Sequence, residues 1–453
     1  MLATTLTDDQ DDLIGHLMDR LTVHRASNAE NAEYYEGDHA TRLVGMSTPP
    51  MLQSIKTVSG WPGTACDVLE ERLDFLGWSA PSEDAFGLDE VYAANSLAVD
   101  SSLAHLDSLI HGISFAIVGA GGPGDPAQLV TIESPNDTTI LWDSKKRRAV
   151  AGLAIRAEDE GRQATAATLY LPDRSVSVER YGSRWKVVDV DRHSLGRVPV
   201  VPVLNRMRGS RPVGRSEITS TVKYLADNAV RTMLAMETNR EFYAAPQRWM
   251  MGADETAFQN PDGSVRSAWE AVMGRVWVAP RDEDGNLPEV GEFRANEPTP
   301  YIKQVELLGQ LLAAEAGIPS SYLGFLTANP SSADAIRAGE ARLVKRAERR
   351  QTIFSRAWLE VARLALMVRD GREPDGFSEV RCRWADAATP TRAAAADEAV
   401  KLIGAGILPP DSRVTYDRIG LTDGEVATLA TDRRRARASS MLTELGRVAD
   451  GNA

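Results

Sequence analysis

A glycine-rich run has the composition of a nucleotide-binding loop. Gly119–Gly124 (GAGGPG) matches G-x-G-x-x-G and follows an apolar, strand-like segment. A dinucleotide site also needs a helix whose N-terminal amides meet the pyrophosphate. Here Pro123 and Pro126 lead instead into the strand-like Gln128–Ile132. We therefore expect a hairpin turn. A nucleotide-using cytoplasmic enzyme built on this β region stays as an alternative, which nucleotide binding at the run would support.

The other residue types that perform catalysis lack the necessary spacing. The six histidines form no H-E-x-x-H motif. The chain contains neither the G-x-S-x-G elbow of an esterase nor the G-x-x-x-x-G-K-[ST] loop of an ATPase. Cys66 and Cys382 lack metal-ligand spacing and cannot build a disulfide framework, which favours a reducing compartment. We expect no catalytic residue, no cofactor and no metal, and therefore a structural role.

A dense group of basic residues could contact phosphates. It lies on a predicted long helix and consists of Arg337, Arg342, Lys345, Arg346, Arg349 and Arg350. Glu340 and Glu348 lie among these residues and oppose a uniform basic field. The formal charge of −13 also argues against a protein that holds nucleic acid by neutralising phosphates. Phosphate contact and ion pairs between packed copies of the chain therefore both stay open.

The middle of the chain predicts two helices and a connector that organise the rest. Tyr301–Ala316 places apolar residues three and four apart, and Gly317 and Pro319 end the pattern. The connector Ser320–Ser332 contains no Lys or Arg. The apolar stripe that follows, Ser332–Arg369, predicts one helix on the order of 57 Å long. A rod of that length exceeds a small domain and needs an extended partner.

A second rod and a small insert precede this region. Ser216–Tyr243 predicts a helix with Ser216 as its N-cap. Between Pro246 and Pro298 we expect a small β insert with strands at Arg275–Ala279 and Val290–Phe293. Three tryptophans lie in this insert: Trp249, Trp269 and Trp277. They either form its core or expose a docking anchor.

The first half of the chain predicts helices followed by strands, and hence an α+β fold. Helices are expected at Asp8–Tyr35, Thr64–Leu76 and Leu88–His111. Seven strands separated by turn residues should form an antiparallel β region packed on helices. They are Phe115–Val118, Gln128–Ile132, Thr138–Trp142, Ala149–Arg156, Ala166–Leu171, Val176–Tyr181 and Trp185–Val190.

The last part of the chain returns to helices. Glu379–Trp384 alternates like a strand that could rejoin the β region. Helices are then expected at Thr391–Ala405, Ser412–Ile419 and Asp423–Leu445. The final helix carries Arg433, Arg434, Arg435 and Arg437. These arginines either contact phosphate groups or form a solvated, ion-paired face.

Composition indicates an ordinary globular chain. Its 453 residues are 43% hydrophobic and 25% charged, which suggests two to four domains. The apolar window Val305–Ile318 carries Glu306 and Glu315 and is too short to span a bilayer, so no membrane segment is predicted. The N-terminal segment is acidic and has no secretion-signal pattern.

Several short segments occur in an order that matches a known family. They are Gly196–Pro202, Asn205, Arg206, Gly214–Ile218, Ala245–Arg248, Gly317–Pro319, Ser331–Glu340 and Asp397–Pro409. From about Tyr34 onward, this order resembles the portal proteins of tailed bacteriophages, in particular the family typified by the portal of the Bacillus phage SPP1. A non-portal structural oligomer is the remaining alternative, and solution mass with electron microscopy would separate it from a ring.

The resemblance implies a portal fold with named parts. Residues 1–215 would form a wing, 216–245 a stem helix, 246–299 a clip, 300–317 a second stem helix, 318–332 a tunnel loop, 333–395 the long helix and a returning wing strand, and 396–453 a helical crown. The stem helices and the long helix would be too slender to be covered within one subunit, so we expect their packing partners in identical neighbours around a pore.

The resemblance also implies partners. The chain would form a ring of twelve copies at one capsid vertex of the virion and act as a conduit for double-stranded DNA in packaging and ejection. The clip would receive the large terminase subunit and later a head–tail connector, and the wing would meet the major capsid and scaffolding proteins. The tunnel loop would present DNA-facing residues, namely Ser320, Ser321, Tyr322, Thr327, Asn329, Ser331 and Ser332.

Overall fold

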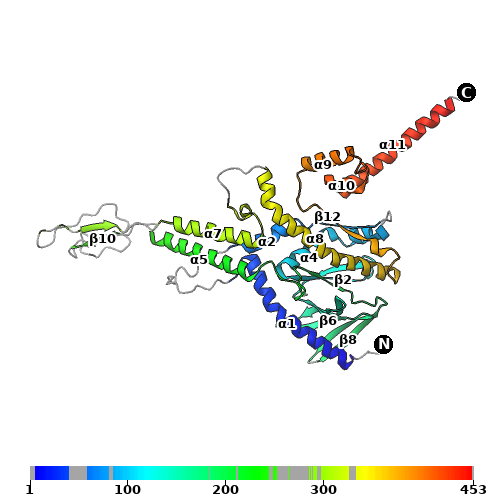
Figure 1. Cartoon of the computed structure of the whole chain (residues 1–453). Coiled ribbons are helices and arrows are strands. Elements are labelled where there is room, and N and C mark those ends of the chain that lie inside the picture. The colour runs from blue at the N-terminus through cyan, green and yellow to red at the C-terminus, as the bar shows by residue number, and fades with distance from the viewer. Residues whose placement is uncertain are drawn as a thin grey trace. The chain divides into compact units, whose positions relative to one another are not determined.

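The computed structural model is a mixed α+β structure with antiparallel sheets (Figure 1). It describes residues 6–39, 59–80, 85–182, 184–210, 213–243, 248–252, 264, 285, 287, 289–292, 297–325 and 333–450. The chain forms two compact units. The first contains residues 1–29, 66–217 and 331–453, and the second contains residues 30–65 and 218–330.

The larger sheet of the first unit is a five-stranded meander. Its strands follow chain order as β4 (Thr138–Asp143), β5 (Arg148–Glu158), β6 (Ala164–Tyr170), β7 (Arg174–Tyr181) and β8 (Arg184–Arg192). Helix α1 (Asp8–Glu36) buries Ile14 and Leu17 against this sheet, in a cluster with Leu153 and Leu169. The polar residues between the strands fix tight turns, which is why all five strands were predictable.

A second sheet of three strands argues against a nucleotide-binding loop at Gly119–Gly124. Its order is β3 (Gln128–Glu133), β2 (Ile113–Ala120) and β9 (Val200–Leu204). Strands β2 and β3 pair antiparallel, and the Gly121 amide donates to the Ala127 carbonyl at 3.3 Å. The predicted hairpin turn is therefore confirmed, because the glycine-rich run joins two strands and no helix begins at it. Strand β9 was not predicted; its one proline, Pro202, is tolerated because β9 is an edge strand.

Two helix predictions in the first half of the chain were wrong at their boundaries. Helix α2 (Trp61–Glu70) ends early, and the chain continues as strand β1 (Phe75–Ser79). The predicted Leu88–His111 helix is two helices, α3 (Leu88–Ala94) and α4 (Leu97–His111). The break lies at Asn95, whose side-chain amide donates to the Gln128 carbonyl and accepts from the Val130 amide, both at 2.8 Å. These bonds to the edge of β3 outweigh helix propensity. The short 3-10 helix Ala85–Gly87 precedes α3.

The long helix α8 (Ala333–Asp370) is continuous, as predicted, but its packing partners lie in its own unit. From Leu343 to Leu366 its buried face packs against sheet and helix residues of that unit. Trp358 stacks on Phe75 with ring centroids 4.9 Å apart, and its indole donates to Nε2 of His105 at 2.9 Å. Burial lowers the pKa of His105 to about 3, so this ring is a neutral acceptor. For this stretch, the expectation that α8 depends on neighbouring copies was wrong.

The chain after α8 returns to the first unit. Following the 3-10 turn Phe377–Glu379, strand β12 (Arg381–Trp384) pairs antiparallel with β1, as a returning strand should. Helices α9 (Arg392–Gly404) and α10 (Arg413–Ile419) lie where helices were predicted, and they begin after the capping hydroxyls of Thr391 and Ser412. Helix α11 (Asp423–Asp450) extends beyond the predicted end at Leu445.

The second unit contains two long helices that lie side by side and run antiparallel (Figure 1). They are α5 (Ser220–Tyr243) and α7 (Thr299–Ala316), and the pair β10 (Arg248–Met251) and β11 (Glu289–Glu292) lies between them in the sequence. Ser216 is not the N-cap of α5, because the Thr219 hydroxyl accepts from the Val222 amide and starts the helix later. The predicted strand Arg275–Ala279 lies outside the described residues.

Candidate functional site

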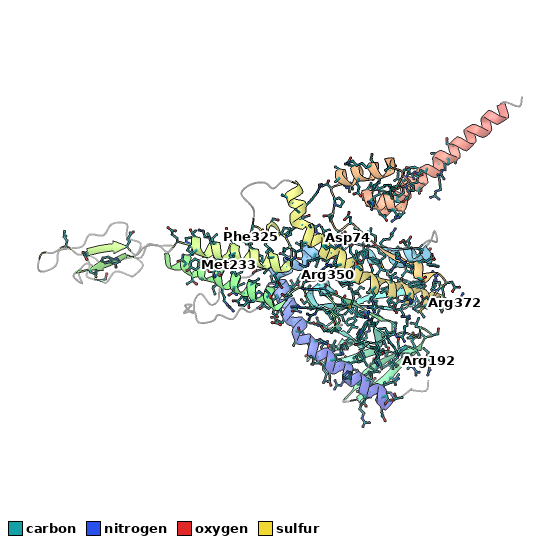
Figure 2. All side chains as sticks on the ribbon, viewed as in Figure 1. Asp74, Arg192, Met233, Phe325, Arg350 and Arg372 are labelled. Carbon is teal, nitrogen blue, oxygen red and sulfur yellow. The ribbon has the colours of Figure 1, made fainter. Side chains whose placement is uncertain are left out.

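A buried carboxylate, Glu217, connects residues 205 and 206 with two arginines of the basic group on α8. Glu217 is 5% exposed and faces three guanidinium groups within the first unit. Its Oε2 lies 2.6 Å from Nη2 of Arg346 and 3.1 Å from Nη1 of Arg206. Its Oε1 lies 2.5 Å from Nη2 of Arg350, a residue of α8 that Figure 2 labels. We call Glu217, Asn205, Arg206, Arg346 and Arg350 the Glu217 cluster.

The charges of the Glu217 cluster do not cancel. Burial by itself would raise the pKa of Glu217, but the nearby guanidinium groups of Arg350, Arg346 and Arg206 hold that pKa below its usual value. The carboxylate is therefore ionised at neutral pH. Three arginines around one carboxylate leave an excess of positive charge, and Asn205 adds a neutral bridge by accepting from Nε of Arg350 at 3.0 Å. Its amide donates to Glu217 at 3.1 Å.

Backbone packing fixes where Glu217 stands. The Asn205 amide donates to the Gly112 carbonyl at 3.0 Å, and the Arg215 amide donates to the Asn205 carbonyl at 2.8 Å. At Gly214, an added Cβ atom would lie 1.6 Å from the Gly112 carbonyl oxygen. Three backbone segments therefore cross here at a distance that only glycine permits. The crossing sets the position of Glu217, whose own amide donates to the Leu109 carbonyl at 2.9 Å.

The structure divides the predicted basic group on α8. Arg346 and Arg350 belong to the Glu217 cluster and form ion pairs within the chain that were not predicted. Lys345 pairs with Glu348 on the same helix at 2.6 Å. Arg337, Arg342 and Arg349 have exposed side chains. Only the exposed members can meet phosphate or a neighbouring copy without breaking a buried ion pair.

The predicted tunnel loop begins with a docked segment. Ser320–Leu323 forms a short 3-10 helix in which Leu323 is buried and Ser321 and Tyr322 are exposed. Phe325 lies so close to α7 that a Cβ atom on Gly309 would come within 2.0 Å of its ring (Figure 2). The ring also meets Trp61 edge-on, with centroids 5.8 Å apart. The apolar part of the loop thus packs partly on its own unit. Four other predicted DNA-facing residues lie outside the described residues: Thr327, Asn329, Ser331 and Ser332.

Of the three clip tryptophans, only Trp249 lies in the described residues. It stands on β10 opposite Gly291 of β11, and its side chain is partly exposed. Its ring covers the Gly291 backbone, since a Cβ atom there would come within 2.3 Å of the indole. Trp269 and Trp277 lie outside the described residues.

Metal-binding, membrane-spanning and thiol chemistry have little basis in the described part of the chain. It holds no group of three or more residues able to bind a metal ion. None of its helices is both long and apolar enough to cross a bilayer. Burial raises the pKa of the Cys382 thiol to about 12 and raises that of Cys66 as well. Both thiols are therefore protonated at neutral pH.

The chain is similar to several known proteins. The chain matches the family model "Phage portal protein, SPP1 Gp6-like" over residues 15–415. The portal protein of Mycobacterium phage D29 is 31% identical over 385 residues, which cover 83% of this chain and 79% of that protein. The portal protein of Mycobacterium phage L5 is 30% identical over 387 residues, with the same coverage of 83% and 79%. A chain from the neck of an empty GTA particle is 14% identical with a TM-score of 0.42, covering 86% of this chain and 98% of that one.

Proposed function

Because this chain belongs to the SPP1 Gp6-like family of phage portal proteins, non-enzymatic virion proteins that form a ring in the phage neck and conduct DNA at a capsid vertex, we propose a role for each segment. The observation that carries the proposal is the order α5, β10–β11, α7, connector and α8. Helices α5 and α7 form the stem that walls the channel, residues 246–299 form the clip, and residues 318–332 form the tunnel loop. Residues 1–215 form the wing and residues 396–453 the crown.

The tunnel loop is proposed as a sliding contact for DNA. Residues 318–332 contain no Lys or Arg, so they cannot form charge-assisted bonds to phosphate. Ser320, Ser321 and Tyr322 offer hydroxyl groups at the start of this segment, and the packing of Phe325 on Gly309 anchors it to α7. Weak, neutral contacts repeated around a ring would let the duplex pass without being held.

Adding a charge to the loop tests this role. Ser321→Arg would place one guanidinium per subunit in the channel, and each charge-assisted phosphate bond contributes about 1.5–3 kcal/mol. We expect DNA packaging into proheads to slow markedly, as measured by the length of DNA protected from nuclease over time. Ser321→Gln is the matched control, because it lengthens the side chain without charge. Equal packaging rates for all three proteins would contradict a DNA-facing loop.

We propose that the ring contains twelve subunits, the number that the resemblance to portal proteins implies. Twelve copies give a mass of 12 × 49.2 kDa, about 590 kDa, and a formal charge of 12 × −13, which is −156. Such a field repels the DNA backbone, so transport needs an external motor. Native mass spectrometry of the purified ring should give about 590 kDa; a mass for another whole number of subunits would replace twelve.

Partners follow from the same segments. The large terminase subunit is proposed to dock on the clip, with Trp249 as a candidate anchor, and a head–tail connector to take its place after packaging. The wing is proposed to meet the major capsid and scaffolding proteins. The exposed Arg337, Arg342 and Arg349 are proposed to form ion pairs with a neighbouring copy or to meet phosphate.

A further inference from the structure

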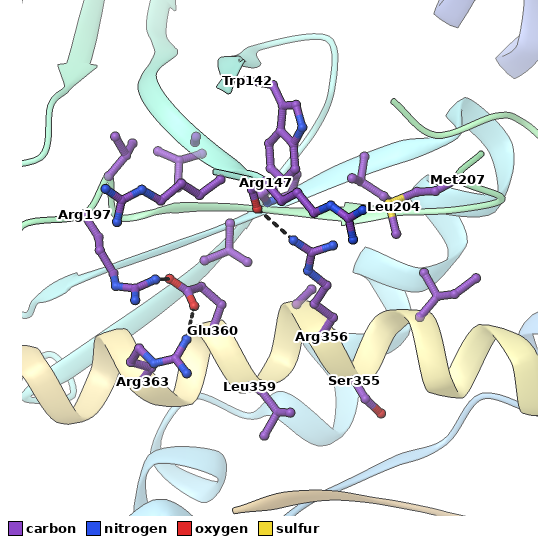
Figure 3. Close-up of a pocket in the computed structure, with 18 of the residues that line it drawn as sticks. Trp142, Arg147, Arg197, Leu204, Met207, Ser355, Arg356, Leu359, Glu360 and Arg363 are labelled. Carbon is purple, nitrogen blue, oxygen red and sulfur yellow. Dashed lines mark hydrogen bonds and ion pairs between the residues drawn. The ribbon is translucent and has the colours of Figure 1, made fainter. Parts of the chain in front are cut away.

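A groove in the first unit lies between the β4–β5 turn, strand β9 and the middle of α8 (Figure 3). Its volume is about 740 Å³, which falls in the range of about 300–1,000 Å³ typical of binding pockets. Its lining belongs to one compact unit, so the groove does not depend on how the two units are arranged. Part of its lining falls within the proposed wing (residues 1–215), but none of the roles proposed above is assigned to the groove itself.

The charge of the groove is opposite to that of the whole chain. Its lining includes Lys146, Arg147, Arg148, Arg197, Arg356 and Arg363. Among the described residues that line the groove, Glu360 is the one acidic residue. Its carboxylate is already paired with Arg197 at 2.8 Å and with Arg363. A basic groove on a chain with a formal charge of −13 is a local feature that needs its own explanation.

The β4–β5 turn presents the exposed cationic side chains of Lys146 and Arg147. Asp143 accepts from the backbone amides of Lys145 at 2.8 Å and Lys146 at 3.0 Å, and so fixes the turn through its main chain. The side chains of Lys146 and Arg147 are exposed and form no hydrogen bond or ion pair with the residues that the structure describes. Arg356 reaches across from α8 and donates to the Arg147 carbonyl at 2.7 Å (Figure 3). The basic side of the groove is thus held in place, and the nearby Asp143 carboxylate, which interacts with Lys146 and Arg148, offsets only part of its charge.

The floor of the groove is apolar, and this decides what can fill it. Val198, Val200 and Leu204 form its buried base, with Ile353 and Ala357 contributed by α8. The phosphates and sugars of a nucleic acid would satisfy the cations but would leave this floor uncovered. A polypeptide that carries both carboxylates and apolar side chains satisfies both parts.

We propose that this groove docks an acidic, amphipathic segment of a partner protein, with apolar side chains on the β9–α8 floor and carboxylates against Lys146, Arg147 and Arg148. The inference rests on the groove alone and stands independently of the roles given to the loop and the stem.

A synthetic probe tests the proposal on the full-length protein. The probe is a fluorescein-labelled peptide of about three helical turns with leucine on one face and glutamate on the other. Fluorescence anisotropy should show saturable binding at low ionic strength that weakens in high salt, since exposed charge pairs are screened. Peptides with glutamine in place of glutamate, or serine in place of leucine, should bind at least about tenfold more weakly.

Paired variants locate the binding. K146Q/R147Q should weaken binding of the acidic peptide about tenfold, because two exposed cations are lost. R184Q/K186Q on β8 is the matched control: it removes the same charge from exposed positions of the same unit and should leave the affinity unchanged. Both variants should melt at the temperature of the wild type.

Five results would overturn the proposal. The first is failure of the wild type to bind the peptide. The second is an equal loss of peptide affinity in K146Q/R147Q and R184Q/K186Q. The third is equal affinity for the leucine and serine peptides, which would mean that the apolar floor does not contribute to binding. The fourth is tight binding of a short DNA duplex that K146Q/R147Q abolishes, which would reassign the groove to nucleic acid. The fifth is a change in self-association, measured by sedimentation of both variants. If K146Q/R147Q alters self-association and the peptide does not bind, a second copy of the chain is the occupant of the groove and the proposal is wrong.

Discussion

Glu217→Gln is expected to lower the free energy of unfolding by about 3–5 kcal/mol, the usual cost of removing one partner from a buried ion pair. The variant keeps the shape of the side chain but leaves Arg206, Arg346 and Arg350 without their counter-charge. Arg350 is 7% exposed, so water cannot replace the lost carboxylate there. Urea unfolding followed by circular dichroism measures the change.

A surface ion pair provides the control for Glu217. Glu398 lies 2.5 Å from Arg418, but its side chain is 55% exposed and that of Arg418 51%. Glu398→Gln should therefore cost less than about 1 kcal/mol. If the two variants lost equal stability, the cluster around Glu217 would not be the buried network that its geometry indicates.

The same carboxylate predicts a pH dependence with a definite sign. The folded-state pKa of Glu217 lies below its usual value because the neighbouring guanidinium groups outweigh the effect of burial. The unfolded chain then binds the proton more readily, so this stabilisation is present above the unfolded pKa of about 4.3 and is lost as pH falls through the folded pKa. The stability difference between wild type and Glu217→Gln should thus shrink at acidic pH, and a constant difference would contradict it.

Local patterns in the sequence accounted for most elements of the fold. The apolar stripe of α8, the paired helices α5 and α7, and the strands β2 to β8 each depend on residues a few positions apart, and the structure contains all of them. The errors arose where distant residues decide. Asn95 breaks a predicted helix because it bonds to β3, and Phe75 joins β1 because β12 and Trp358 lie beside it.

The candidate site shows the same limit. Arg346 and Arg350 were recognised as a basic group, but their partner Glu217 lies 129 and 133 residues away in the sequence. Periodicity carries no information across such a separation. The available signal was indirect: Asn205, Arg206 and Glu217 all fell within segments that matched the portal family, but nothing in their spacing indicated that they meet. The roles of the loop and clip residues remain predictions that depend on the assembled ring.

Gly214→Ala is expected to destabilise the chain by more than about 3 kcal/mol, beyond the usual cost of overpacking. The added Cβ atom would lie 1.6 Å from the Gly112 carbonyl oxygen and 2.9 Å from that of Asn205, and backbone atoms cannot rotate away as a side chain can. The other side of the crossing is equally close, since Gly112 has a φ of +92° and a Cβ atom placed on it would lie 2.8 Å from the Arg215 carbonyl carbon. The variant should be poorly soluble on expression or melt far below the wild type.

Gly209→Ala is the matched control for Gly214→Ala, because no atom lies within 4 Å of a Cβ at that position. It should change stability by no more than about 0.5 kcal/mol. Gly214 also sets the position of Glu217, so the double variant G214A/E217Q should lose less than the sum of the two single losses. A Gly214→Ala protein that melts with the wild type would mean that the backbone crossing is looser than described, and strict additivity would mean that the crossing does not position the carboxylate.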